Sequence, residues 1–315
     1  MIKILHIYRG YGRDLKNPVV DNQITSLKKK ASVEIFTYVI RKGGLEYLRS
    51  IKNLRALVNN NQIDVIHAHY SFSGFVAGLA FTAKPIICSL MGSDVLSSSI
   101  ERKILKGFKK LFWRITIVKS KEMQNLIPHS KLVPNGVDLK NFRIIEKNRA
   151  LEKVKFDHRK INILFVATSP EVPVKNLNLA RNAIRFLNSE LKEDKFVLNI
   201  LSDIDYNELP YYYSAANMLI MTSLSEGSPN VIKEAMACNC PIVATDVGDI
   251  RELINGVLGC SIVKHEVESV VEAIKNIISS GKRSNGRMRL QNISSVKISN
   301  ELVNLYQSII GKNRL

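Results

Sequence analysis

Two glutamates flank the start of a predicted helix in the second half of the chain. The run from Ser225 to Ala237 reads Ser-Glu-Gly-Ser-Pro-Asn-Val-Ile-Lys-Glu-Ala-Met-Ala. Ser228 is a favoured helix N-cap, and Pro229 suits the first helical position because its missing N–H would be unpaired there anyway. A glycine-bearing loop that leads into a helix offers backbone N–H groups and the positive end of the helix dipole to an anion. This stretch is therefore predicted to bind an anion such as a diphosphate.

The place of Glu234 follows from the helical step of about 100° per residue. The apolar residues of this helix form one arc that is expected to face the core, comprising Val231, Ile232, Ala235, Met236 and Cys238. Glu234 falls at the rim of that arc, whereas Lys233 falls nearer the solvent side. A carboxylate at a core rim can accept hydrogen bonds from a bound hydroxyl group. The alternative interpretation is that Glu226 and Glu234 only complement the helix dipole.

The residues after this helix complete a longer pattern. Asn239 suits a left-handed C-cap, and Pro241 to Thr245 read as a buried strand. The run from Glu226 to Ala237, followed by the run from Pro241 to Gly248, resembles the donor-binding signature of family 4 retaining glycosyltransferases of the GT-B fold. The resemblance spans roughly two dozen ordered positions in a strand-loop-helix-strand context, which makes it specific. It implies an enzyme of the kind that builds bacterial cell-surface polysaccharides.

The resemblance also implies roles for individual residues of the run. Glu226 would contact the transferred sugar, and Glu234 would hold the ribose hydroxyl groups. The backbone that would support the sugar and the phosphates passes through Gly227, Ser228, Pro229, Asn230 and Val231. In the family, the diphosphate leaves and the acceptor attacks on the same face of the sugar, so no side chain need act as a covalent nucleophile.

Lys175 resembles the family's lysine that meets the donor diphosphate, where a positive charge stabilises the leaving group. The arginine that usually precedes this lysine is missing between Thr168 and Val174. Asp203 and Asp205 match the letters of a metal-binding Asp-x-Asp, but acids in a loop at a strand end are more often turn formers. We expect no metal and no cofactor, because Lys175 and the helix N-termini could neutralise the diphosphate.

Strands alternate with helical stretches through both halves of the chain, which predicts an α/β fold with two doubly wound parallel sheets. The predicted strands are residues 1–7, 33–38, 64–69, 85–90 and 115–118, then 161–166, 196–201, 217–223, 241–245 and 258–263. By resemblance these are two Rossmann-like domains facing a cleft, an acceptor domain of residues 1–137 and a donor domain of residues 138–297. The resemblance further implies that residues 298–315 form a helix crossing back to the first domain.

Strand ends in the first half supply candidates for the acceptor side. Gly10 and Gly12 lie in the loop after the first strand, and His69 ends the third strand. Ligands of open α/β sheets gather at the carboxyl ends of strands, so His69 is a candidate catalytic residue and His67 a structural one. No metal site is expected here, because no further ligand cluster accompanies these two histidines.

Gly92-Ser93-Asp94 follows the next strand end and resembles the family's Gly-Ser-Asp element. Many members have a histidine immediately before this glycine, whereas this sequence has Met91. Ser93 and Asp94 are therefore candidates for the acceptor side. A helix cap is an equally good interpretation of Asp94.

Nearly all of the net charge of +18 lies in the first half of the 315 residues. Residues 1–150 carry 26 Lys and Arg against 10 Asp and Glu, or +16. Within them, Arg102 to Arg114 interleaves basic and apolar residues at helical spacing, which is typical of a helix on an anionic membrane, with Trp113 suited to the interface. The alternative is an ordinary surface helix with its apolar face in the core. No nucleic-acid-recognition motif is present, so no nucleic-acid partner is expected.

Composition favours a cytoplasmic enzyme. The four cysteines show no metal spacing and no disulfide framework, which fits a reducing compartment. The start shows no signal peptide, and no apolar run reaches the roughly 20 residues of a membrane-spanning helix. Together with the basic helix, these observations predict a cytoplasmic enzyme, peripheral on the inner face of the membrane.

The sequence thus predicts a retaining, metal-independent glycosyltransferase. Its expected partners are a nucleoside diphosphate sugar and a hydroxyl group of a glycan or lipid-linked acceptor. Two alternatives stay open. A GT-B sugar-nucleotide epimerase would release an altered sugar without any acceptor, and a non-catalytic subunit would bind the nucleotide sugar without turnover.

Overall fold

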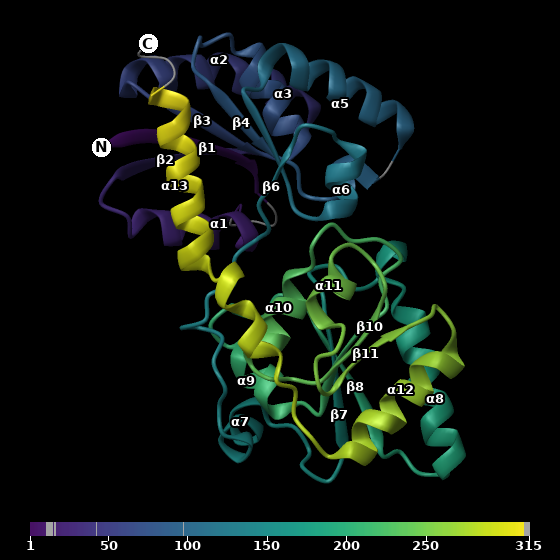
Figure 1. The fold of residues 1–315 in the computed structure, drawn as a ribbon. Helices are drawn as coiled ribbons and strands as arrows, with labels where there is room; N and C mark the ends of the chain where they lie inside the picture. The colour runs from purple at the N-terminus through teal and green to yellow at the C-terminus, as the bar shows by residue number, and fades with distance from the viewer. Residues whose placement is uncertain (11–14, 16, 42, 97, 312–315) are drawn as a thin grey trace. The chain divides into compact units, whose positions relative to one another are not determined.

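The computed structural model describes residues 1–10, 15, 17–41, 43–96 and 98–311. The chain divides into two compact units, which we call the first unit (Met1–Gly136 with Ser295–Leu315) and the second unit (Val137–Ser294). Each unit is built on its own parallel sheet (Figure 1). The predicted α/β class with two Rossmann-like sheets is therefore confirmed.

The sheet of the first unit has the strand order β2-β1-β3-β4-β5-β6, and every pair is parallel. Its strands are β1 (Ile2–Arg9), β2 (Val33–Ile40), β3 (Val65–His69), β4 (Ile86–Ser89), β5 (Ile115–Val118) and β6 (Lys131–Leu132). β6 was not predicted, because a strand of two residues leaves no periodic pattern in the sequence. In the register of β1 and β3, His6 lies opposite His67, so both side chains are on one face.

Helices cover both faces of this sheet. They are α1 (Pro18–Lys28), α2 (Gly44–Asn61), α3 (Ser71–Leu79), α4 (Ser93–Leu96), α5 (Ser99–Phe112), α6 (Lys121–Leu126) and α13 (Ser295–Gly311). Side chains of α2, α3 and α5 pack together against one face. Helix α13, shown in yellow in Figure 1, packs against the other face beside α1. No helix of the described ranges is long and apolar enough to cross a membrane.

Helix α5 contains most of the basic run, and its residues face two ways. Leu105 is buried, and Phe108 and Phe112 pack against α3 at Gly78. The expectation that Trp113 lies at a membrane interface is wrong, because its side chain is buried and its indole N–H donates to the carbonyl of Gly74 at 3.1 Å. The side chain of a larger residue at position 74 would collide with this ring.

The sheet of the second unit has the parallel order β11-β10-β9-β7-β8. Its strands are β7 (Ile161–Val166), β8 (Phe196–Leu201), β9 (Met218–Met221), β10 (Ile242–Thr245) and β11 (Cys260–Val263). All five were predicted from their apolar runs. Because they are parallel, their carboxyl ends lie at one edge of the sheet.

Helices α8 (Leu177–Leu191) and α12 (Val267–Ser280) lie side by side on one face of this sheet (Figure 1). The other face packs against α9 (Leu209–Ala215), α10 (Asn230–Ala237) and α11 (Ile250–Ile254). The unit also contains α7 (Lys147–Val154) and the 3-10 helices η1 (Pro173–Lys175) and η2 (Gly286–Ile293). Arg287 of η2 donates to the carbonyls of Phe142 and Ala237, both at 2.6 Å, and so fixes the last turn of α10.

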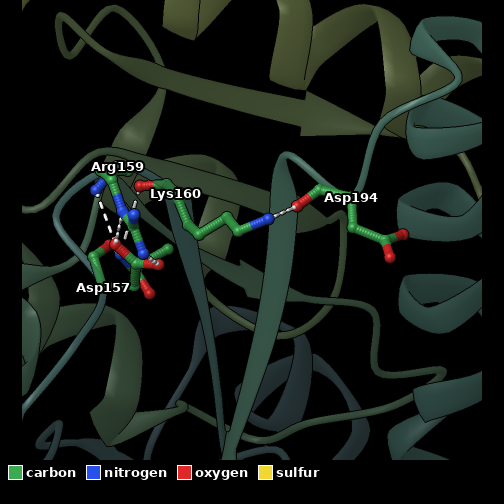
Figure 2. Close-up of polar contacts among 5 residues, drawn as sticks. Asp157, Arg159, Lys160 and Asp194 are labelled. Atoms are coloured by element: carbon green, nitrogen blue, oxygen red, sulfur yellow. Dashed lines mark hydrogen bonds and ion pairs between the residues drawn. The ribbon is translucent and has the colours of Figure 1, made fainter.

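The amino ends of β7 and β8 are tied by polar contacts, shown in Figure 2. Asp157 accepts two hydrogen bonds from the guanidinium of Arg159, each at 3.2 Å. Lys160 donates to the backbone carbonyl of Asp194, in the loop before β8. The pair of Asp157 and Arg159 is exposed, so it adds little stability, and it lies at the opposite edge from the strand ends discussed next.

Candidate active site

Helix α10 begins one residue later than predicted. Its first residue is Asn230, and Pro229 is the N-cap in an extended conformation, so the expectation that Ser228 caps the helix is wrong. The hydroxyl of Ser228 is engaged elsewhere, since it donates to Asp249 Oδ2 at 2.5 Å and accepts from Lys233 Nζ at 2.5 Å. The side chain of the N-cap residue, Pro229, caps none of the first backbone N–H groups of α10.

Lys233 is fully buried, and its predicted position toward solvent is wrong. Its Nζ also lies 3.7 Å from Asp249 Oδ2. Burial lowers the pKa of Lys233 and raises that of Asp249, while the attraction between the two groups opposes both shifts. The helical period could not reveal this, because the start of α11 covers the side of α10 that an isolated helix would expose.

Glu234 is buried, and its Oε2 accepts a hydrogen bond from the hydroxyl of Tyr213 at 3.0 Å. Burial raises the pKa of Glu234 to about 7, although the Tyr213 hydrogen bond and the charge of Lys233 act in the opposite direction. One oxygen of this carboxyl group is therefore held by α9, and the group changes charge near neutral pH.

Lys175 and Glu226 form an ion pair, with 2.5 Å between Nζ and Oε1. The hydroxyl of Ser223 donates to the same Oε1 at 2.9 Å. Both charged side chains keep part of their surface exposed, 28% for Lys175 and 17% for Glu226. A bound anion could therefore reach the ammonium group and displace the carboxylate.

The loop after β10 packs directly against the loop after β9. Gly248 has a φ angle of +61°, and a Cβ atom there would lie 2.8 Å from the carbonyl oxygens of both Glu226 and Gly227. Only glycine allows this approach.

The first two residues of α10 were also predicted to contact the donor. The side-chain oxygen of Asn230 is buried without a hydrogen-bond partner, and Val231, the next residue, is half-buried.

The fold brings several predicted residues of the second unit to one edge of its sheet. Lys175 follows β7, Glu226 and Ser228 follow β9, and Glu234 lies on α10 directly beyond. Sequence reasoning missed three residues that hold them, namely Ser223, Tyr213 and Asp249. The position of Asp249 after a predicted strand was a usable signal, whereas nothing in the sequence connects Tyr213 with Glu234.

His67 and His69 have a third histidine beside them, so the expectation that no further ligand accompanies them is wrong. His6 Nδ1 shares a hydrogen bond of 2.9 Å with His69 Nε2, and a ligand atom of each histidine lies within 4.8 Å of the others. His67 bonds to Tyr306 of α13 at 2.7 Å and to Ser89 at 2.8 Å. Four of the six ring nitrogens thus serve an internal network, while His6 Nε2 is buried without a partner.

Burial keeps these three histidines neutral. It lowers the pKa of His6 to about 3 and those of His67 and His69 well below their usual value. The neighbouring charge of Lys119 lowers the latter two further. His69 therefore faces the core, with one ring nitrogen committed to His6.

The remaining acceptor-side candidates are structurally varied. Gly10 directly follows β1, where a Cβ atom would clash with the backbone of Leu15, and Gly12 lies outside the described residues. Ser93 begins α4, with its hydroxyl 3.3 Å from that of Tyr70. Asp94 is buried in α4, where burial raises its pKa to about 6.

Asp94 is a cap, but not of its own helix. It accepts the N–H of Ser71, at the start of α3, at 3.0 Å, and also the N–H groups of Met91 and Gly92. These backbone donors stabilise its ionised form and so oppose the effect of burial on its pKa.

Two family models match consecutive parts of the chain. Residues 7–141 match the model of Glycosyltransferase Family 4, and residues 148–280 match that of Glycosyl transferases group 1. The chain belongs to the family 4 glycosyltransferases. The second model includes every strand of the second sheet, and the first includes β2 to β6 and the end of β1.

Known proteins resemble this glycosyltransferase over most of its length. An uncharacterized glycosyltransferase of Methanocaldococcus jannaschii is 29% identical, over 75% of this chain and 72% of its own. The UDP-Gal:alpha-D-GlcNAc-diphosphoundecaprenol alpha-1,3-galactosyltransferase of Escherichia coli is 21% identical, over 82% of this chain and 75% of its own. The Anabaena protein HepE, crystallised with UDP-glucose, aligns with 98% of this chain and 100% of its own at a TM-score of 0.76 and 15% identity. The predicted fold and enzyme class are confirmed.

The histidine network predicts acid sensitivity of the first unit. Because the folded-state pKa of His6 is lowered, the unfolded chain binds more protons below about pH 6.5, and stability is lost as pH falls. His6→Asn should flatten the loss between pH 6 and pH 4 by about 1.4 kcal/mol per pH unit. Urea unfolding followed by the fluorescence of Trp113, the one tryptophan in the sequence, measures this. The exposed His129, changed to Asn, serves as the control, and equal slopes for His6→Asn and wild type would contradict the prediction.

Proposed function

We propose that this protein is a retaining glycosyltransferase that moves a sugar from a nucleoside diphosphate sugar to a hydroxyl of a glycan or lipid-linked acceptor. The carrying observation is the ion pair of Lys175 and Glu226 beside the uncapped start of α10. The Escherichia coli relative, named for a lipid-linked acceptor, and the Anabaena protein, crystallised with UDP-glucose, support this choice of substrates. A role in cell-surface polysaccharide synthesis is also proposed, and a Bacillus subtilis relative named as a putative teichuronic acid biosynthesis glycosyltransferase supports it.

The donor is proposed to bind by exchanging partners within the second unit. Its diphosphate accepts hydrogen bonds from the first N–H groups of α10 and from Lys175. Lys175 then releases the carboxylate of Glu226, which becomes free to accept hydrogen bonds from the sugar hydroxyls. Glu234 keeps its bond to Tyr213 through Oε2 and offers Oε1 to the ribose.

The reaction is proposed to proceed without a covalent intermediate and without a metal ion. Charge grows on the diphosphate as the sugar leaves, so Lys175 and the N–H groups of α10 stabilise the transition state more than the bound donor. The acceptor oxygen bonds to the anomeric carbon on the face that the diphosphate leaves, and its proton passes to the departing diphosphate oxygen, so the configuration is retained. Lys175 and the helix dipole supply the positive charge that a metal ion supplies in other enzymes.

The first prediction for this site concerns Glu234. Glu234→Gln should weaken UDP binding by about 1 to 3 kcal/mol, since the ribose loses bonds to a charged acceptor. Because the pKa of the buried carboxyl is about 7 and only its ionised form accepts both hydroxyls, wild-type affinity should rise from pH 6 to pH 8, more steeply than that of the variant. Calorimetry at each pH measures both effects, with the exposed Glu268→Gln as control. Identical pH dependence in wild type and Glu234→Gln would remove Glu234 from the site.

The second concerns Lys175 and tests the proposed activity itself. A panel of UDP, GDP and dTDP sugars, incubated with the wild type, should identify a donor that is hydrolysed or transferred. Lys175→Met should lower its turnover about a hundredfold or more while changing the Michaelis constant less. Lys195, exposed in the same unit, provides Lys195→Met as the matched control. Turnover close to wild type refutes the role of Lys175, and release of an epimerised sugar without transfer favours an epimerase.

We also propose that the first unit docks on an anionic membrane through α5. The core-facing side of this helix contains Leu105, and a separate stripe remains in solvent. That stripe is apolar and comprises Ile100, Ile104 and Leu111, which are 71%, 58% and 76% exposed. Exposed lysines at positions 103, 106 and 110 accompany it. Apolar side chains between basic ones are suited to the headgroup region of an anionic bilayer.

The third prediction for the proposed function tests this surface. Each lysine near an anionic surface contributes about 1 kcal/mol, so changing Lys103, Lys106 and Lys110 together to Gln should abolish co-sedimentation with phosphatidylglycerol vesicles. Lys109 is left intact because its ammonium group donates to the carbonyl of Pro128. The same change at Lys192, Lys195 and Lys282 of the second unit, which are also exposed, should leave binding unchanged. If wild type stays in the supernatant at low salt, the membrane proposal is wrong.

A further inference from the structure

Lys233 precedes Glu234 on α10, yet the two side chains contact different parts of the second unit. Glu234 bonds to α9 through Tyr213, whereas Lys233 bonds to Ser228 and approaches Asp249. Lys233 is 0% exposed and Asp249 is 8% exposed. This is a buried charge pair with a hydroxyl group between its members.

The hydroxyl of Ser228 is fully oriented by this pair. It accepts from the ammonium group and donates to the carboxylate, both at 2.5 Å. Asp249 occupies the N-cap position of α11 but makes no side-chain cap there, because its carboxylate points to Ser228 instead. Three segments are thus joined, namely the loop after β9, the first turns of α10 and the loop after β10.

The third segment also supports the backbone on either side of the site. Gly248, adjacent to Asp249, lies directly against the carbonyl oxygens of Glu226 and Gly227. Asp249 therefore fixes both a side chain and, through Gly248, the peptide groups that precede α10. A small shift of Asp249 would move the same N–H groups and the same Glu226 that the proposed function uses.

A buried ion pair is a poor source of stability, because desolvation offsets most of the attraction between the charges. Stability alone therefore does not account for burying an ammonium group in this small helix. Geometry does, since two charged partners define one position for the hydroxyl between them.

We propose that Lys233 and Asp249 are positioning residues for the donor, acting through Ser228. They touch no substrate. They hold the loop after β9 in the conformation in which its backbone and Glu226 can meet a nucleoside diphosphate sugar. This inference rests on the proposed function.

The test is a double-mutant cycle in UDP binding. Lys233→Met keeps the length of the side chain and removes its charge, and Ser228→Ala removes the hydroxyl. We expect Lys233→Met to raise the dissociation constant for UDP at least tenfold, because misplacement of binding groups by about 1 Å costs as much as a hundredfold. Combined with Ser228→Ala, it should add less than threefold to the effect of Ser228→Ala alone, since both changes break the same link. If Lys233→Met does not fold, the isosteric Asp249→Asn takes its place.

Lys119→Met is the matched control. Lys119 is also buried, but it belongs to the first unit and donates to the carbonyl of Val133. Its loss should lower the melting temperature and leave the UDP dissociation constant unchanged. All affinities are measured well below the melting temperature of each variant.

The outcomes separate the two claims. If wild type binds UDP and folded Lys233→Met binds it equally well, the positioning role is wrong and the proposed function stands. Effects of Lys233→Met and Ser228→Ala that multiply would also overturn it, because the two would then act independently. If wild type binds none of UDP, GDP, ADP and dTDP, both claims fail.

Discussion

Parallel pairing of β7, β9 and β10 is the constraint on which the candidate site depends. Their hydrogen bonds place three carboxyl ends at one edge, although helices separate the loops that follow them in the sequence. Each loop then contributes one charged group, namely Lys175, Glu226 or Asp249. Without this pairing none of the contacts of the site could form.

Charge compensation is the second organising principle of the second unit. Lys175 is paired with Glu226, and both side chains are partly exposed. Lys233 is paired with Asp249, and both are buried. The two pairs differ in what they can do. A ligand can compete for an exposed partner, whereas a buried partner is shielded from exchange and can hold a fixed geometry. For Glu234, burial outweighs the Tyr213 hydrogen bond and the charge of Lys233, so its pKa is raised to about 7.

The first unit buries three polar histidine rings inside an apolar core. His6 bonds to His69, while His67, whose ring lies against both, bonds to Ser89 and to Tyr306 of the final helix. Helix α13 is thereby joined to the sheet by a specific hydrogen bond as well as by apolar packing. On α5, one stripe of apolar residues packs in the core, as the surface-helix interpretation expects, and a second stripe lies in solvent, on which the membrane proposal rests.

The sequence by itself determined the parallel α/β architecture, ten of the eleven strands that the described residues form, and the loop-helix run around Glu226, because hydrophobic period and turn residues are local signals. It also indicated Lys175 and Glu234 through a resemblance carried by ordered motifs. Tertiary structure alone decided that the Ser228 hydroxyl bonds to Lys233 and Asp249 instead of capping α10, and that Lys233 is buried. It also decided that Trp113 packs on Gly74 and that His6 lies beside His67 and His69. Each of these depends on what a distant segment places against the residue. A helical period describes an isolated helix and contains no information about its neighbours.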